Sequence, residues 1–247
     1  MGTLRIGCSG WHYLGWIGPF YPPGTPLKHL LRAYAGHFST TEINNSFYRV
    51  PTEKAVRNWR EETPDGFLFA WKASRFITHN KKLRDAGDSI AFIFGRMDGL
   101  GDKFGPVLWQ LPPQLGRDDA RLAAFLKLLP KRRLHAVEFR NPGWYEKPIF
   151  DLLRDRDIAL CISDHHDAPA PRLATAGHVY VRLHGPGGGY QGDYPRAALA
   201  RWAADIGKWR RTGKSVFLYF DNDWQAAAPR DAATLIRLVR NRGTRVD

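Results

Sequence analysis

Val179-Tyr180-Val181-Arg182-Leu183-His184 alternates apolar side chains with aromatic or charged ones, a pattern typical of a β-strand with two different faces. Seven comparable runs occur at residues 4–9, 41–44, 68–72, 107–110, 136–140, 159–164 and 216–221. Helix-like segments separate most of these runs. Eight strands that alternate with helices predict an α/β fold, the TIM-type (β/α)8 barrel, in which one face of each strand meets the helices and the other meets the barrel axis.

The length of 247 residues suits one such barrel, so we expect a single domain over residues 1–247. Thr25-Pro26 has the pattern of a capped helix start, and Thr52 and Asp118 or Asp119 are expected to begin later helices. Further helices are expected within residues 83–103 and at 147–156, 195–211 and 231–240. Pro169 and Pro171 interrupt the segment between the sixth and seventh strands, so the helix there should be missing or reduced.

The chain is strongly basic, with 37 Lys and Arg against 24 Asp and Glu, a net charge of +13 and a pI near 10.0. This balance favours acidic partners, such as phosphorylated small molecules, nucleic acid or an anionic surface. The competing interpretation is a basic surface that is merely solvated, since net charge bears on association and not on fold.

Cys8 and Cys161 are the two cysteines, and neither belongs to a C-x-x-C pair. We therefore expect buried thiols in a reducing cytosol, without a zinc knuckle or a disulfide framework. No leader-like segment precedes the first strand, and no apolar run approaches 18 residues. These features predict a cytoplasmic protein with no membrane partner.

Strand alternation places many polar residues on the axial face, near the carboxyl ends of the strands. If Ile43 faces the helices, Glu42 and Asn44 face the axis. The same rule turns inward Lys72, Gln110, Glu138, Arg140, Arg182 and His184. Barrel enzymes place their active sites at this end, so the pattern predicts a polar pocket there. The alternative is a self-satisfied ion network that ties the strands together.

We assign candidate catalytic roles to Glu42, Glu138 and His184. Candidate substrate-binding residues are Trp11, Asn44, Lys72, Gln110, Arg140, Arg182, Gly187, Gly188 and Asn222. Glu42 and Glu138 lie on nearly opposite strands, which permits the separation of roughly 6.5–9.5 Å found in inverting glycosidases. Lys72 and Arg140 would keep either acid ionised, which argues against a general acid with a raised pKa.

The segment 184–190, His-Gly-Pro-Gly-Gly-Gly-Tyr, follows the seventh strand. Its glycines would let backbone N–H groups converge on an anion, and barrels often hold phosphate at the loops after strands 7 and 8. Arg182 would lie just beneath. The alternative is a flexible surface loop.

Other polar clusters are less specific. Residues 164–167, His79 and residues 221–223 carry imidazoles and carboxylates that suit zinc, iron or manganese, but none has a diagnostic ligand spacing. We therefore assign no metal ligand and leave the cofactor unknown. The aromatic residues of the first loop, Trp11 among them, could stack on sugars or bases, or simply pack.

Several motifs together resemble one known family. They are Gly7-Cys8-Ser9-Gly10-Trp11, Phe20-Tyr21-Pro22, the run 41–49 (TEINNSFYR), Phe76-Ile77-Thr78-His79, Gln110-Leu111-Pro112-Pro113, Glu138-Phe139-Arg140, the run 180–185 (YVRLHG) and Phe220-Asp221-Asn222-Asp223. Their order and spread over nearly the whole chain resemble the YecE-like proteins, domain of unknown function 72 (DUF72). The resemblance implies a TIM barrel and a family without a settled reaction. Asp221 stands where the usual pattern has Asn, and Asn45 where it has a small or hydroxyl residue, which affects local hydrogen bonding.

The leading functional expectation is a hydrolase-like enzyme that acts on an anionic or phosphate-containing substrate, with nucleic acid among the candidates. The second is a glycosidase-like hydrolase that uses Glu42 and Glu138. The third is a non-catalytic binder of nucleic acid or of a phosphometabolite. The sequence leaves these three open, and whether the protein is an enzyme at all stays undecided at this stage.

Overall fold

The computed structural model describes residues 2–247 and shows a closed barrel of eight parallel strands in sequential order. The strands are β1 Leu4–Ser9, β2 Thr40–Ile43, β3 Leu68–Lys72, β4 Phe104–Gln110, β5 His135–Glu138, β6 Ala159–Ser163, β7 His178–Leu183 and β8 Ser215–Phe220. Pairing between β1 and β8 closes the ring, with Leu4 opposite Val216 and Cys8 opposite Phe220. The predicted TIM-type barrel is therefore confirmed.

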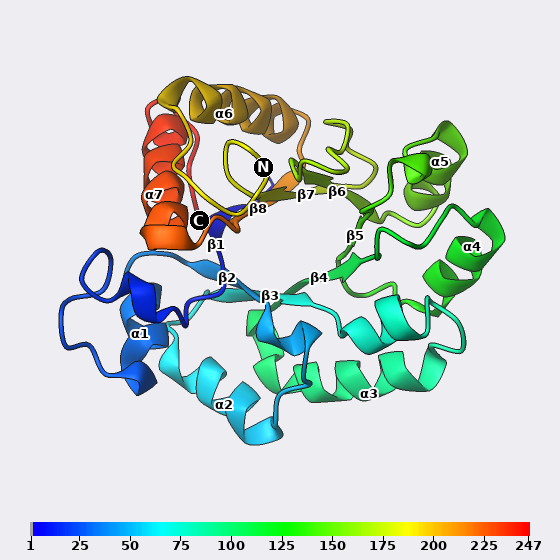
Figure 1. Ribbon diagram of the computed structural model, residues 1–247, viewed down its shortest axis with the longest axis horizontal. Coiled ribbons are helices and arrows are strands. Elements are labelled where there is room, and N and C mark those ends of the chain that lie inside the picture. The colour runs from blue at the N-terminus through cyan, green and yellow to red at the C-terminus, as the bar shows by residue number, and fades with distance from the viewer. Residues whose placement is uncertain (1) are drawn as a thin grey trace.

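Within residues 2–247, seven α-helices surround the strands (Figure 1). They are α1 Leu30–Ala35, α2 Glu53–Glu62, α3 Gly87–Met97, α4 Asp119–Leu128, α5 Lys147–Arg154, α6 Arg196–Arg211 and α7 Ala227–Arg240. Coil alone joins β6 to β7, as the two prolines predict. Among the described residues, none of the helices combines the length and apolarity needed to cross a bilayer.

Side-chain caps mark the starts of α2 and α4. The side chains of Thr52 and Asp118 accept hydrogen bonds from the backbone N–H groups of Ala55 and Arg121, as expected for N-caps. The expectation for Thr25 is wrong: its hydroxyl donates to the carbonyl of Pro22, and a short 3-10 turn, Leu27–His29, precedes α1. The last helix begins at Ala227, four residues before the expected start.

Pro229 explains that difference, because proline is tolerated in the first turn of a helix, where its missing N–H would lack an intrahelical partner anyway.

The interior of the barrel is divided into an apolar lower part and a polar upper part. The lower part is a cluster of small and aromatic side chains: Ala70, Leu108, Ala136, Ala159, Cys161, Ala176, Tyr180, Phe217 and Tyr219. The large rings come from β7 and β8, and the alanines on β3, β5 and β6 leave space for them, which lets the interior close-pack. Cys8 instead belongs to the larger core between the strands and the helices.

Gly7 is required where β1 approaches β2. A Cβ at this position would lie 2.2 Å from the carbonyl oxygen of Thr40 and 2.9 Å from the hydroxyl of Tyr34. That hydroxyl donates to the Thr40 carbonyl and accepts from the N–H of Cys8, so it bridges the two strands. Any side chain on Gly7 would therefore push this bridge apart.

We predict that Gly7→Ala lowers the free energy of unfolding by about 2 kcal/mol or more, since overpacking against backbone atoms cannot relax easily. The matched control is Gly95→Ala near the end of α3, where an added Cβ meets nothing within 4 Å. That change should raise the free energy of unfolding by roughly 0.5–1 kcal/mol. Urea titrations measure both, and equal effects of the same sign would contradict the assignment.

Candidate functional site

The guanidinium of Arg182, fully buried on β7, is the centre of the upper part of the barrel. Its Nε and Nη2 donate to Glu42 on β2, with Nη2–Oε1 at 2.9 Å. Nη1 donates to Glu138 on β5 at 3.1 Å, and Nη2 donates to Asp221 after β8 at 2.7 Å. Nη1 also reaches Nε2 of His184 at 3.1 Å. All five N–H groups of the guanidinium are thus engaged.

Glu42 and Glu138 are both fully buried, and both accept charge-assisted hydrogen bonds. Ser9 and Tyr180 donate their hydroxyls to Glu42 at 2.5 Å and 2.6 Å, and Arg140 Nε donates to Glu138 at 2.5 Å. Burial raises the pKa of Glu138, but the charges of Arg140 and Arg182 lower it more, so its net pKa lies below the ordinary value. Glu138 is therefore a carboxylate at neutral pH and cannot donate a proton to a leaving group.

His184 lies between the two arginines. Its Nε2 is 3.1 Å from both Arg140 Nη2 and Arg182 Nη1, which can only donate. Nε2 must therefore be the acceptor, and Nδ1 carries the proton and faces Asp164 Oδ1 at 3.3 Å. Because its free electron pair is already bound and the ring is fully buried, His184 orients the arginines in this arrangement.

Two cations form the outer edge of the network. Lys72 and Arg140 are 8% and 7% exposed, whereas Glu42 and Glu138 are sealed beneath them. Arg140 uses three of its five N–H groups, on Glu138, His184 and the hydroxyl of Tyr190. Lys72 has no hydrogen-bond or ion-pair partner among residues 2–247, and its Nζ lies 4.3 Å from the centre of the Phe47 ring.

The positive character of this edge is visible in two histidines. Burial, together with the charges of Lys72 and Arg75, lowers the pKa of His79 to about 4. Burial, together with the charge of Arg140, lowers the pKa of His165 to about 4 as well. Both imidazoles are therefore neutral at pH 7.

The glycine-rich loop after β7 packs against the coil between β6 and β7. A Cβ on Gly188, whose φ is +69°, would lie 2.5 Å from the backbone nitrogen of His166. The carbonyl of Gly188 accepts from Nδ1 of His166 at 3.0 Å, while Gly187 is exposed. The loop thus carries Tyr190 to Arg140. Binding roles for Gly187 and Gly188 stay predictions.

The remaining predicted binding residues lie at three places. Gln110, at the end of β4, is 9% exposed, and its Oε1 is buried without a partner. Trp11 and Asn44 line a small cavity of about 80 Å³ beside the mouth, where Trp11 packs edge-on against Trp59. Asn222 lies away from the axis, because its amide donates to the carbonyl of Gly192 and to Asp231 in α7.

Alternation along β1 turns Ser9 toward the axis, as the sequence predicts, although Ser9 was given no role in the site. Sequence reasoning missed Tyr180, Asp164 and Asp221 as members of the network. Alternation predicts the direction of two of them, because Tyr180 precedes Arg182 by two residues and Asp221 follows Tyr219 by two. Asp221, and not Asn222, is therefore the axial residue after β8. Asp164 lies beyond the end of β6, where alternation no longer predicts direction.

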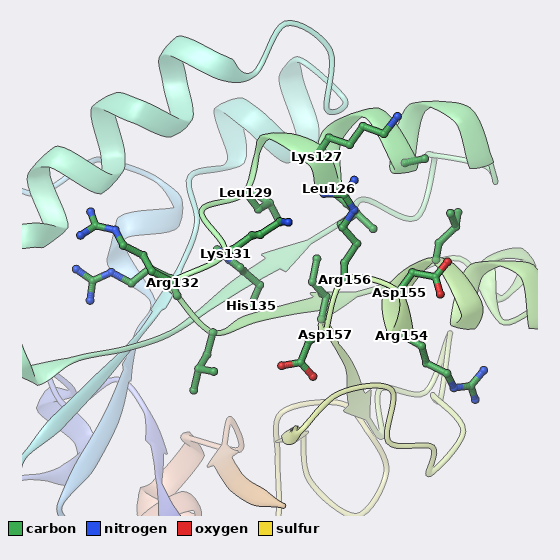
Figure 2. A pocket seen from close by; sticks show the side chains of 15 residues that line it. Leu126, Lys127, Leu129, Lys131, Arg132, His135, Arg154, Asp155, Arg156 and Asp157 are labelled. Carbon is green, nitrogen blue, oxygen red and sulfur yellow. The ribbon is translucent and has the colours of Figure 1, made fainter.

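The larger cavity of about 660 Å³ lies at the opposite end of the barrel, beside the first residues of β5 and β6. Figure 2 shows its lining side chains on the connections from α4 to β5 and from α5 to β6. Basic side chains such as Lys131 and Arg156 mix there with Asp155 and Asp157. Since barrel sites lie at the carboxyl ends of the strands, the mouth is the better candidate despite its smaller space.

A possible cation-binding group also occurs at the mouth. His165, His166 and Asp167 place ligand atoms within 4.8 Å of one another, and His166 and Asp167 are exposed. Exposed groups of this kind are common without a metal, and we assign no metal ligand here.

We predict that Arg182→Met lowers the free energy of unfolding by about 3–5 kcal/mol at pH 7, since three buried carboxylates lose their shared partner. In the wild type, the folded pKa of Glu138 is depressed below its ordinary 4.5, so its contribution to stability is full above that pH and is lost as the pH falls further. In the variant, unpaired buried carboxylates favour protonation, and lowering the pH from about 7 to 5 should restore stability. Urea titrations at both pH values, with Arg237→Met as the exposed control, measure this difference. An equal loss at both pH values would contradict it.

Comparisons with known proteins agree with this architecture. The chain is similar to the UPF0759 protein YunF of Bacillus subtilis, at 24% identity over an alignment of 269 residues that covers 96% of this chain and 94% of that protein. It is 36% identical over 118 residues to the UPF0759 protein YecE of Escherichia coli K12, which is 47% of this chain but only 43% of that protein, so less than half of that relative is matched.

Two solved structures share the fold. A DUF72 family protein from Thermotoga maritima has a TM-score of 0.88 at 21% identity, covering 96% of this chain and 99% of its own. Another from Enterococcus faecalis has a TM-score of 0.83 at 18% identity, covering 99% and 97%. A family model described as a protein of unknown function, DUF72, matches residues 5–247. With the motifs, the barrel and this match in agreement, the chain belongs to the DUF72 family.

Proposed function

We propose that this protein is an enzyme that binds a small anionic substrate, such as a phosphate ester or a carboxylate, at the mouth of the barrel. The observation that carries the proposal is the distribution of unused donors. Lys72 has no partner among the described residues, and Arg140 retains two N–H groups, whereas the donors of Arg182 are all engaged. The sequence suggested Arg182 as the residue that binds the anion. Because its donors are all engaged, we assign that contact to Lys72 and Arg140 instead.

The exposure of the charged side chains at the barrel mouth favours an anionic ligand over a cationic one. Arg182 neutralises part of the charge of Glu42, Glu138 and Asp221. Lys72 and Arg140 reach solvent, whereas Glu42 and Glu138 do not. A ligand that enters the mouth can thus reach the two cations but not the two fully buried glutamates. A guanidinium with free N–H groups also offers phosphate or carboxylate the geometry that these anions prefer.

Titratable groups beside this anion site support a reaction in place of simple binding. Burial and Arg182 lower the pKa of Lys72 to about 8, and His79 is neutral with a pKa of about 4. An amine whose pKa lies near neutral pH is a group that acid–base and nucleophilic catalysis use. Gln110 Oε1, buried without a partner, offers one further acceptor to a bound substrate.

A glycosidase-like reaction has less support, because Glu138 is held ionised and both glutamates are sealed by Arg182. Nucleic acid is the other anionic candidate, supported by the net charge of +13. Salt separates it from a small anion, since contacts to many phosphates weaken steeply as salt rises, while one or two contacts do not.

We predict that glycerol phosphate and inorganic phosphate raise the melting temperature of the wild type in a saturable manner, and that Arg140→Gln lowers their affinity about tenfold. Lys72→Met should also weaken them, and serves as an independent variant if the loss of Arg140 perturbs Glu138. Arg237→Gln, an exposed substitution in α7, is the matched control and should leave the affinity unchanged.

Equal losses from Arg140→Gln and Arg237→Gln would mean that overall charge attracts the anion, which would overturn the proposed site. Binding of single-stranded DNA with a steep salt dependence and no response to Lys72→Met would favour the nucleic-acid interpretation instead.

A further inference from the structure

Two lysines in the described chain are almost completely buried, and they differ in one respect. Lys103 is 5% exposed, and its Nζ donates to the carbonyls of Arg60 and Thr63 at 2.7 and 2.6 Å and to the Thr63 hydroxyl at 3.2 Å. Lys72 is 8% exposed, and no residue among 2–247 accepts a hydrogen bond from its Nζ. The Nζ of Lys103 therefore makes three hydrogen bonds, and that of Lys72 makes none with the described residues.

The surroundings of Lys72 favour the neutral amine. Burial removes solvation from the ammonium, and the neighbouring guanidinium of Arg182 opposes a second positive charge, so the pKa falls from 10.5 to about 8. The carboxylates of Asp221, Glu138 and Glu42 act in the other direction but are already bound to Arg182. At pH 7 roughly one Lys72 in ten is then an unprotonated nucleophile. Its Nζ still touches solvent, because it is not one of the fully buried side-chain nitrogens that have no hydrogen-bond partner.

The side chains beside Lys72 supply the other parts that amine chemistry needs. The His79 ring lies edge-on to the same Phe47 ring that Lys72 covers, 4.9 Å between ring centres, with Nδ1 2.9 Å from the Thr78 hydroxyl. This imidazole is neutral at pH 7 and can share a hydrogen bond with a bound reactant. Arg140, with two free N–H groups, can hold an anionic group of the reactant.

We propose that Lys72 forms an imine with the carbonyl carbon of a small anionic aldehyde or ketone, such as a 2-oxo acid, whose anionic group Arg140 holds. This inference rests on the proposed anionic substrate. The amine attacks the carbonyl carbon, the electron pair of the C=O bond moves to oxygen, and a proton from nitrogen passes to that oxygen. Loss of one water then forms the C=N bond. No electron is gained or lost, so no further reactant is required.

The experiment is reductive trapping of the folded full chain with pyruvate and sodium cyanoborohydride, followed by peptide mapping. Reduction of the imine leaves an adduct with the mass of pyruvate less one oxygen atom. We expect Lys72 to be labelled roughly tenfold faster than the exposed Lys127, because its amine is less protonated. Lys103 in the same molecule is the buried control and should stay unlabelled. Labelling of Lys72 no faster than that of Lys127 would overturn the inference.

The pH profile provides a second readout. The rate of adduct formation at Lys72 should rise with pH and level off above about 8, whereas that at exposed lysines should keep rising toward 10.5. Lys72→Arg should abolish the fast adduct and leave the slow surface labelling. A Lys72 profile that matches that of Lys127 would contradict a dedicated amine.

Pyruvamide, the neutral analogue of pyruvate, separates this inference from the proposed function. We expect pyruvate to label Lys72 faster than pyruvamide does, and Arg140→Gln to remove the difference. Equal labelling by both probes in the wild type would retain the imine and contradict the anionic substrate. Conversely, a saturable, Arg140-dependent thermal shift with phosphate but no adduct at Lys72 would retain the anion site and contradict the imine. Competition of phosphate with pyruvate in the wild type gives the same comparison without any variant.

Discussion

One buried guanidinium determines how the upper half of this barrel is built. Arg182 binds carboxylates from β2, from β5 and from the residue after β8, so it connects strands that never pair with one another. Each of these charges would be costly to bury alone, and the arrangement is tolerable only because every donor of the guanidinium has a partner. The network therefore leaves its central arginine unable to contact a ligand. It also fixes the tautomer of His184 and the ionised state of Glu138, and it leaves Lys72 and Arg140 as the cations of the network with unused donors.

The fold could be predicted from the sequence because a barrel imposes a simple rule on each strand. One face contacts helices and the other contacts the axis, so alternation in runs such as 179–184 identifies both the strands and their inward residues. The same rule brought Glu42, Lys72, Glu138, Arg140 and Arg182 to one end. Alternation also holds one residue past β8, where it turns Asp221 toward the axis. The prediction of Asn222 as a binding residue did not follow this rule. The early start of α7 and the uncapped start of α1 depend on turn geometry that the sequence pattern does not encode.

The sequence could not predict which polar side chains are fully hydrogen-bonded and which keep unused donors, because this depends on side-chain geometry at a scale of tenths of an ångström. Arg140 and Arg182 have the same chemistry and the same strand face, yet one has two unused donors and the other has none. Lys72 and Lys103 are both buried, but Lys103 finds backbone carbonyls and Lys72 finds an aromatic ring. The amino-acid composition shows only that charged side chains are present. Whether the donors of a given side chain find acceptors depends on the length of that side chain and on how deep its position lies in the barrel.

The two cysteines lie on opposite sides of the barrel wall. Cys8 packs among the residues between the strands and the helices, and Cys161 belongs to the apolar cluster on the axis. Both thiols are completely buried, and burial raises both of their pKa values, so neither reacts readily while the wall is intact. The chain therefore contains two intrinsic probes of its own opening: alkylation of Cys8 reports when a helix leaves the strands, and alkylation of Cys161 reports when the ring of strands itself separates. A difference between the two rates would show whether the helical layer and the barrel come apart together or in sequence.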